Sequence, residues 1–221
     1  TLTGRLLWGG GTIWARLMFS RFVDYVREKK PAAIIATHIT AANAAVSARM
    51  LTGETFPIVC VPTDYEIEGL WPHLSTDLFC VADERMAETL RPRRVPENRI
   101  RVTGIPAAPT FSMKYDRTEM RREFELPDDK QVVLFLAGAT LPRPYMHFRN
   151  SLREMLPYMH AFDDMEIVVV AGKDAEYAEE TRRYVKQLGL VNVRVLDFVT
   201  NMPGLMASAD LIVCKPGGLT V

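Results

Sequence analysis

Residues 195–220 read VLDFVTNMPGLMASADLIVCKPGGLT and contain the strongest fold signal in the chain. Two apolar runs, 193–198 and 211–214, enclose a short helical pattern over 202–208. Neither run alternates strictly between apolar and polar residues, which is typical of parallel strands covered on both faces. Strand, helix and strand in this order predict a parallel α/β sheet.

The same alternation of strands and helices extends along the rest of the chain. Apolar runs predict further buried strands at 32–36, 58–61, 78–81, 100–102, 132–136 and 167–171. Helical patterns lie between them at 41–51, 83–90, 117–124, 147–161 and 175–188. Asp83 and Asp116 are suited to cap two of these helices. The whole pattern predicts a doubly wound α/β fold.

One segment interrupts this alternation and predicts a domain boundary. Residues 104–130 contain Pro106, Pro109 and Pro127 and have little sustained apolar character. Such a segment suits a junction between two α/β units. We therefore expect two domains, 1–110 and 111–221.

Composition excludes some classes of function. The chain has 221 residues with 27 basic and 27 acidic side chains, and zero net charge argues against a general nucleic-acid binder. The four histidines show no metal-ligand spacing, so we expect no metal site. The cysteines lie in apolar runs without CxxC spacing and are interpreted as core residues of a cytoplasmic protein: Cys60, Cys80 and Cys214.

The residues that follow the predicted strands are the candidates for ligand binding, because open parallel sheets bind ligands beyond the carboxyl ends of their strands. Gly217 and Gly218 would let backbone N–H groups approach an anion, and Thr220 would add a hydroxyl, which favours phosphate. A plain strand-to-helix turn also uses glycine, so both interpretations stay open. His38 is either a base or a structural residue, and Asp64 either holds a sugar hydroxyl or caps a turn.

Several motifs that end or follow the predicted strands occur in a recognisable order. Ahead of 195–220 they are PAAIIATH (31–38), TDYEIEGLW (63–71), RVTGIP (101–106), FLAGA (135–139) and VVVAGK (168–173). The ordered set resembles the MurG-like glycosyltransferases of family 28, in the branch of monogalactosyldiacylglycerol synthase and processive diacylglycerol glucosyltransferase. The resemblance implies a GT-B fold of two Rossmann-like domains, the first membrane-facing and acceptor-binding, the second binding a UDP-hexose.

The resemblance also implies a reaction. A hexose would pass with inversion from UDP-glucose or UDP-galactose to diacylglycerol, and the UDP-sugar would be a substrate, with no cofactor. The enzyme would be cytoplasmic and peripheral on the inner face of the plasma membrane, or on the plastid envelope if it is plant-type. One alternative is an enzyme that transfers GlcNAc from UDP-GlcNAc to a polyprenyl-linked acceptor. The other is a non-catalytic module that binds a nucleotide sugar.

Site residues follow from the resemblance by position. His38 and Asp64 are the catalytic candidates within the chain. Trp14, Phe19 and Trp71 are expected on the membrane or acceptor side, although the apolar stretch Leu6–Val26 equally suits a helix packed on its own sheet. The UDP-sugar is expected at Gly138, Phe198, Val199, Met202, Lys215, Gly217, Gly218, Leu219 and Thr220.

The sequence departs from the family pattern in four places. The family's first strand, whose Gly-His loop commonly carries the proposed base, would lie before Thr1, and the acidic residue that holds the ribose would lie after Val221. THP becomes Thr37–His38–Ile39, and the glycine usual after FLAGA is replaced within Thr140–Leu141–Pro142. The chain is therefore expected to be an internal piece that is inactive by itself.

Overall fold

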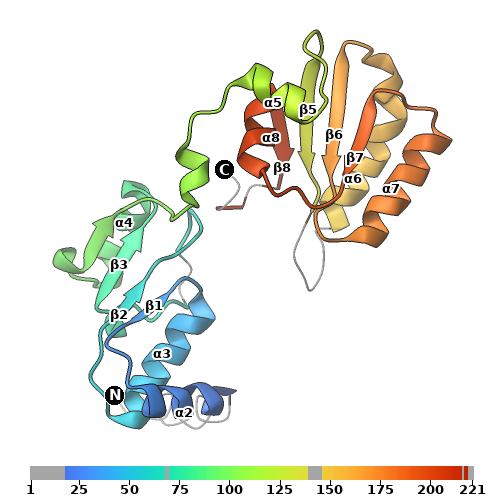
Figure 1. The fold of residues 1–221 in the computed structure, drawn as a ribbon. Helices are drawn as coiled ribbons and strands as arrows, with labels where there is room; N and C mark the ends of the chain where they lie inside the picture. Colours follow the sequence, from blue (N-terminus) through green and yellow to red (C-terminus); the bar gives the residue numbers. More distant parts are fainter. Residues whose placement is uncertain (1–17, 68–69, 139–145, 216, 219–221) are drawn as a thin grey trace. The chain divides into compact units, whose positions relative to one another are not determined.

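The computed structural model describes residues 18–67, 70–138, 146–215 and 217–218 (Figure 1). Two compact units make up the chain, Thr1–Ala107 and Ala108–Pro216, with Gly217 and Gly218 grouped with the first unit. Each unit contains a four-stranded sheet of its own. All strands in both sheets are parallel, as the apolar runs predicted.

The first unit is a parallel sheet with strand order β1-β2-β3-β4. Its strands are β1 (Ile34–Ala36), β2 (Ile58–Cys60), β3 (Leu78–Val81) and β4 (Ile100–Val102). Its helices are α2 (Ser20–Lys29), α3 (Ile39–Thr52) and α4 (Glu84–Leu90). The predicted cap is confirmed at α4, where the Asp83 carboxylate accepts the Met86 N–H at 2.9 Å.

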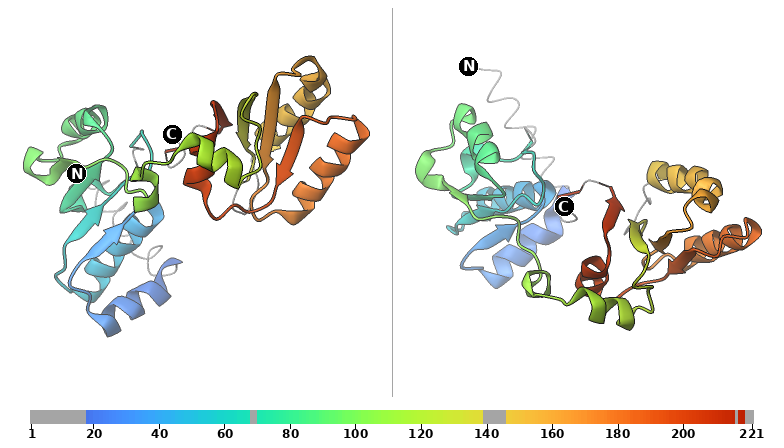
Figure 2. Two further views of the ribbon diagram at one scale, coloured as in Figure 1. Left: turned by 45° about the horizontal axis from the view of Figure 1, so that its top comes forward. Right: turned by 90° about the horizontal axis from the view of Figure 1, so that it is seen from above.

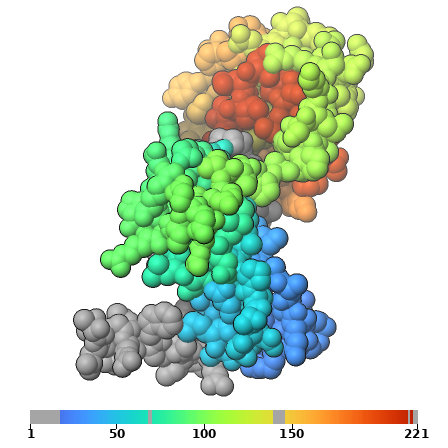
Figure 3. Space-filling view, turned by 90° about the vertical axis from the view of Figure 1, so that its left-hand side faces the viewer, coloured from blue at the N-terminus to red at the C-terminus, as the bar shows by residue number. Residues whose placement is uncertain are grey.

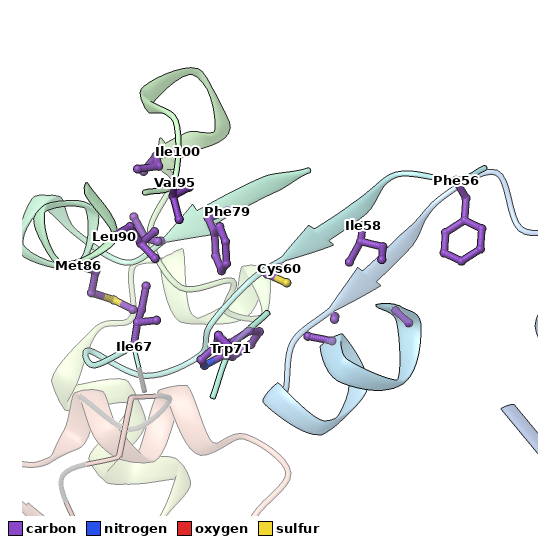
Figure 4. Packing of buried hydrophobic residues seen from close by; sticks show 14 of the residues in the cluster. Phe56, Ile58, Cys60, Ile67, Trp71, Phe79, Met86, Leu90, Val95 and Ile100 are labelled. Atoms are coloured by element: carbon purple, nitrogen blue, oxygen red, sulfur yellow. The ribbon is translucent and has the colours of Figure 1, made fainter. Parts of the chain in front are cut away.

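A hydrophobic core lies inside the first unit (Figure 4). Ile58 and Phe79 are fully buried on neighbouring strands. Trp71, from the segment before β3, meets Phe79 edge to face with 6.4 Å between ring centroids. Cys60 lies in the same core, and burial raises the pKa of its thiol to about 11. The expectation that Cys60 is a small core residue is confirmed.

Helix α2 shows how the end of the apolar stretch Leu6–Val26 folds. Val23 and Val26 are buried in the core of the first unit, and Phe22 packs against it. On the exposed side of the helix, Arg27 forms an ion pair with Asp24 at 2.7 Å. This part of the stretch is therefore a helix packed on its own domain, one of the two interpretations of the sequence.

Asp77 predicts a pH dependence for the first unit. Its Oδ2 accepts the Ile58 N–H at 2.8 Å and pairs with Arg49 at 2.5 Å. Partial burial acts to raise the pKa of Asp77, but the two hydrogen bonds outweigh it and hold the pKa below its usual value. A lowered folded-state pKa adds stability above the unfolded pKa of about 4, and this stability is lost as pH falls through the folded pKa.

We therefore expect Asp77→Asn to flatten the loss of stability between about pH 5 and pH 2. Chemical denaturation at a series of pH values measures how steeply the free energy of unfolding falls with pH in the wild type and in the variant. Equal slopes in the wild type and the variant would contradict this assignment.

The second unit is a parallel sheet with strand order β7-β6-β5-β8. Its strands are β5 (Gln131–Leu136), β6 (Met165–Val170), β7 (Val193–Leu196) and β8 (Leu211–Cys214). Its helices are α5 (Arg117–Glu123), α6 (Met146–Met155), α7 (Ala175–Gln187) and α8 (Met202–Ser208). Asp116 caps α5 as predicted, because its carboxylate accepts the Glu119 N–H at 2.9 Å.

Helices cover both faces of the second sheet (Figure 2). Val133 and Phe135 of β5 point to the face covered by α6 and α7. Val132 and Leu134 of the same strand point to the opposite face, where α8 packs. Helix α5 lies beside α8, visible in Figure 3 as yellow-green and red atoms on one face of this unit. Burial on both faces explains why these strands lack a polar alternation.

The predicted helix 147–161 is two elements in the structure. Helix α6 ends at Met155, and a 3-10 segment, Leu156–Ala161, continues the chain. Pro157 has no N–H to donate, and its ring clashes with the carbonyl four residues earlier, so the α-helix cannot continue through it. The end of α6 was therefore readable from the sequence, and the longer prediction was wrong.

Arg121 of α5 is buried and ties this helix to the second sheet. Its guanidinium donates to the Ser208 carbonyl at 3.1 Å and to Asp210 Oδ2 at 2.6 Å. Two further bonds run to the carbonyls of Pro127 and Asp128. Arg121 therefore fixes the loop before β5 and the residues before β8 relative to each other.

Candidate functional site

The connections of the second sheet create one favoured ligand position. The connection from β5 to β6 passes through α6 on one face, whereas the connection from β7 to β8 passes through α8 on the other face. Strand β8 then pairs with the free side of β5. The carboxyl ends of β5 and β8 therefore flank the topological switch point, where open α/β sheets bind ligands. Gly138 and Lys215 stand just beyond these two strand ends.

The turns after β5 and β6 touch through their backbones. A Cβ atom on Gly138 would lie 3.0 Å from both the N and the Cα of Gly172. Gly172 has φ +71°, which disfavours any other residue. The strand ends are tied as well, because the Ala137 N–H donates to the Val170 carbonyl at 3.0 Å. The two turns therefore form one continuous backbone surface at the carboxyl edge.

The turn after β7 adds an exposed aromatic ring to this edge. Phe198 is 57 % exposed, and the Lys173 ammonium lies 4.9 Å from the centre of its ring. Val199 and Met202 follow, both half-buried against the cluster under α8. Asn201 caps α8 by accepting the Gly204 N–H at 3.1 Å. Three of the predicted donor residues thus gather at the end of β7, with Phe198 the most exposed.

The predicted phosphate turn is only partly described by the structure. Lys215 is exposed and directly follows β8. Gly217 and Gly218 are grouped with the first unit rather than with the second sheet. Leu219 and Thr220 lie outside the described residues. The assignment of the two glycines to a donor diphosphate therefore stays a prediction.

One buried group at this edge was missed by the sequence analysis. Arg149 of α6 reaches the Ala137 carbonyl, Asp174 and the ring of Tyr177. It borders a hollow of about 320 Å³ between α6 and α7. The available signal was its spacing to Leu152 and Leu156, which places an arginine on the buried face of the helix. Asp174 had a signal of its own, an acidic residue just before a helical pattern.

His38, the first catalytic candidate, is the N-cap of α3. Its Nδ1 accepts the Thr40 N–H at 3.1 Å. In the neutral ring the proton is then on Nε2, so the nitrogen that could take a proton is already engaged. The capping bond favours the structural interpretation of His38 over a role as general base.

The cap predicts a measurable difference between two variants of His38. His38→Ala should lower the free energy of unfolding by about 1 kcal/mol, because the Thr40 N–H loses its acceptor. His38→Asn should keep most of that stability, since asparagine caps well. Urea denaturation followed by circular dichroism measures both, and an alanine variant as stable as the asparagine variant would rule out the cap.

The other acceptor-side candidates lie in different surroundings. Asp64 is exposed after β2, where its Oδ1 accepts the Tyr65 N–H at 2.9 Å. Phe19 is half-buried just before α2, and Trp14 lies outside the described residues. Trp71 is only 7 % exposed and packs in the core, so the prediction of an acceptor- or membrane-facing Trp71 is corrected. Leu70 beside it is 75% exposed, so the apolar character of this motif does not show which side chains are buried.

Among helices in the part of the chain that the structure describes, none is long and apolar enough to cross a bilayer. Over the same residues, no three His, Cys, Asp or Glu side chains form a group that could hold a metal ion.

Two family models match successive parts of the chain. Residues 12–107 match the model of monogalactosyldiacylglycerol (MGDG) synthase. Residues 146–221 match the glycosyltransferase family 28 C-terminal domain. The chain therefore resembles the family 28 glycosyltransferases, in the branch of monogalactosyldiacylglycerol synthase. The resemblance carried by the ordered motifs is thereby confirmed in both halves.

The curated proteins similar to this chain include two enzymes from Bacillus species. It is 25% identical over 209 residues to a processive diacylglycerol beta-glucosyltransferase of Bacillus licheniformis, covering 95% of this chain and 52% of the relative. It is 27% identical over 173 residues to the enzyme of the same name from Bacillus subtilis, covering 78% and 44%. The chain thus spans about half the length of the curated relatives that it matches.

Solved structures show the same fold. MurG of Acinetobacter baumannii is 21% identical, with a TM-score of 0.55 over 95% of this chain and 52% of that one. Anabaena HepE, solved with UDP and glucose, is 14% identical, with a TM-score of 0.56 over 88% and 54%. The predicted GT-B fold is confirmed by these likenesses.

Proposed function

We propose that this chain serves a glycosyltransferase that moves a hexose from a UDP-sugar to diacylglycerol. The MGDG synthase match over 12–107 supports the lipid acceptor, and the names of the Bacillus relatives support the same acceptor. The family 28 match and the HepE complex with UDP and glucose support the donor. The structural observation that carries the proposal is the switch point between β5 and β8, flanked by Gly138 and Lys215.

The second unit is suited to hold the donor. Tight turns with glycine let backbone N–H groups approach phosphate oxygens, as at Gly138 and Gly172. Lys173 and Lys215 place positive charge after β6 and β8. Fixed N–H groups and cations would stabilise the charge that develops on departing UDP. We accordingly propose that the reaction uses neither a metal nor a cofactor.

The reaction is a single displacement at the anomeric carbon. The acceptor hydroxyl oxygen bonds to this carbon while its bond to the β-phosphate oxygen breaks, and the electron pair leaves with UDP. The hydroxyl proton passes to a general base. Because His38 uses Nδ1 as a cap, Asp64 is the better-placed of the two candidates within the chain.

Diacylglycerol lies within a bilayer, so the enzyme must meet it at the membrane surface. We propose peripheral attachment at the cytoplasmic face, with the stretch that precedes α2 as the contact. Trp14 and Phe19 are the residues to test. Loss of binding to anionic liposomes in a Trp14→Ala, Phe19→Ala variant supports this attachment, and unchanged co-sedimentation contradicts it.

Product analysis tests the proposed function. Protein that contains this chain is incubated with labelled UDP-glucose or UDP-galactose and vesicles carrying either diacylglycerol or a polyprenyl-linked sugar. We expect labelled glycosyl-diacylglycerol, and the preferred donor then identifies the hexose. Product on the polyprenyl lipid alone would favour a MurG-like acceptor, to which the structural likeness to MurG points. UDP binding with no product on either lipid would instead indicate a nucleotide-sugar-binding module.

A further inference from the structure

Arg149 joins the turns after β5 and β6 through one buried side chain. Only 6% of this side chain is exposed. Its Nε donates to the Ala137 carbonyl at 3.1 Å, and Nη1 donates to Asp174 Oδ2 at 2.7 Å. The guanidinium also stacks on Tyr177, 3.7 Å from the ring centre. Ala137 precedes Gly138, and Asp174 follows Gly172 and Lys173, so both contacts lie beside the candidate donor edge.

The partner of Arg149 is itself fixed in place. The Asp174 carboxylate caps α7 by accepting the Tyr177 N–H at 3.1 Å. The Arg149 hydrogen bond is the main reason why the pKa of Asp174 lies below its usual value, and the Tyr177 N–H adds to it. The pair is therefore charged at neutral pH, and it holds the start of α7 against α6.

The contact between the turns after β5 and β6 means that the hydrogen bonds of Arg149 affect both turns. The backbones of Gly138 and Gly172 are in direct contact, with no side chain between them. Neither turn can therefore move without displacing the other. Arg149 fixes both turns from behind, one through Ala137 and the other through Asp174. A shift of about 1 Å in such a surface can weaken ligand positioning by orders of magnitude.

The remaining donor of Arg149 argues that the residue does more than stabilise the fold. Its Nη2 is fully buried, and no hydrogen-bond partner is found for it among the described residues. An unsatisfied buried donor destabilises the folded state, and an apolar side chain of similar size would avoid that cost. A buried arginine that destabilises the fold in this way is typical of a residue with a role in ligand binding rather than in packing.

We propose that Arg149 is a positioning residue of the donor site, which sets the Gly138 turn against the Gly172 turn so that their backbone N–H groups meet the diphosphate of a nucleoside-diphosphate sugar. The inference rests on the proposed function and deepens it. Arg149 acts through Ala137, Gly138 and Asp174 and does not itself contact the reacting atoms.

Arg149→Lys tests the proposal, because lysine keeps the charge but cannot bridge two acceptors while stacking on a ring. Arg153→Lys is the matched control. Arg153 lies on the same helix and stacks on Tyr184 at 4.6 Å, but no hydrogen bond between it and either turn is seen among the described residues. Calorimetric titration with UDP measures the dissociation constant of each variant, and urea denaturation measures its stability.

We expect Arg149→Lys to weaken UDP binding at least tenfold and Arg153→Lys to change it by less than twofold. Amide NMR signals of Gly138 and Gly172 should shift in the first variant only, which a general loss of stability would not produce. If Arg149→Lys does not fold, Asp174→Asn replaces it, since asparagine keeps the cap and removes the charge. That variant should also weaken UDP binding, by a smaller factor.

The outcomes separate this inference from the proposed function. A wild-type chain that binds UDP, with equal affinity in Arg149→Lys or, in its place, Asp174→Asn, overturns the positioning role and leaves the proposed function standing. A wild-type chain that does not bind UDP overturns the donor assignment itself.

Discussion

Replacing Arg121 with methionine is expected to lower the free energy of unfolding of the second unit by about 3 kcal/mol. The change removes the four hydrogen bonds that Arg121 makes to Ser208, Pro127, Asp128 and Asp210. Removing one partner of a buried ion pair costs about 3–5 kcal/mol, and the partial exposure of Asp210 places this case at the lower end. Arg117, which also pairs with Asp210, retains part of the network.

Native-state hydrogen exchange measures this effect in each unit separately. The slowest amides of β5 and β8 report the second unit, and those of β2 and β3 serve as an internal control. Arg122→Met, an exposed neighbour on the same helix, is the matched variant and should change stability by less than about 0.5 kcal/mol. Equal protection of β5 and β8 in the Arg121 and Arg122 variants would contradict the bracing role of Arg121.

The second large effect is expected at Gly138. A methyl group there would meet the backbone N and Cα of Gly172 at 3.0 Å, so Gly138→Ala must push the two turns apart. We expect the affinity for UDP to fall at least tenfold, about 1.4 kcal/mol, because the backbone groups that we propose to face the donor phosphates move.

Gly189→Ala provides the control for this prediction. Gly189 has φ +68°, so alanine is strained there too, but nothing lies within 4 Å of its added Cβ. It precedes β7, at the amino edge of the sheet, away from the candidate site. Both variants should lose stability, whereas only Gly138→Ala should lose UDP affinity. A parallel loss of affinity in both would show that strain, not the contact with Gly172, is responsible.

The sequence predicted most of the fold because its parallel strands are short, continuously apolar runs, which leave a simple signal. Leu78–Val81 and Leu211–Cys214 appear in the structure with the predicted bounds. Helix caps were also predictable, because a cap depends on residues close together in the sequence. Asp83 and Asp116 cap their helices as expected. Pro157 was readable as the end of α6 and was overlooked.

The features of the site that were missed depend on contacts between distant residues. Gly138 and Gly172 meet because β5 and β6 pair as neighbouring strands. No local sequence pattern predicts which strands pair. Arg149 lies in a helical pattern where an arginine normally faces solvent, and its partners belong to other elements. Trp71 follows Leu70, which is exposed, yet Trp71 itself packs against Phe79 in the core. Tertiary packing decided each of these cases.

Titration of the chain with UDP and with ADP, followed by amide NMR, tests the central claim most directly. The claim is that the carboxyl edge of the second sheet holds the uridine diphosphate of the donor. UDP is predicted to bind at least tenfold more tightly than ADP, with the largest shifts at Gly138, Gly172 and Phe198. Equal binding of the two nucleotides, or shifts confined to residues outside this edge, would contradict the account.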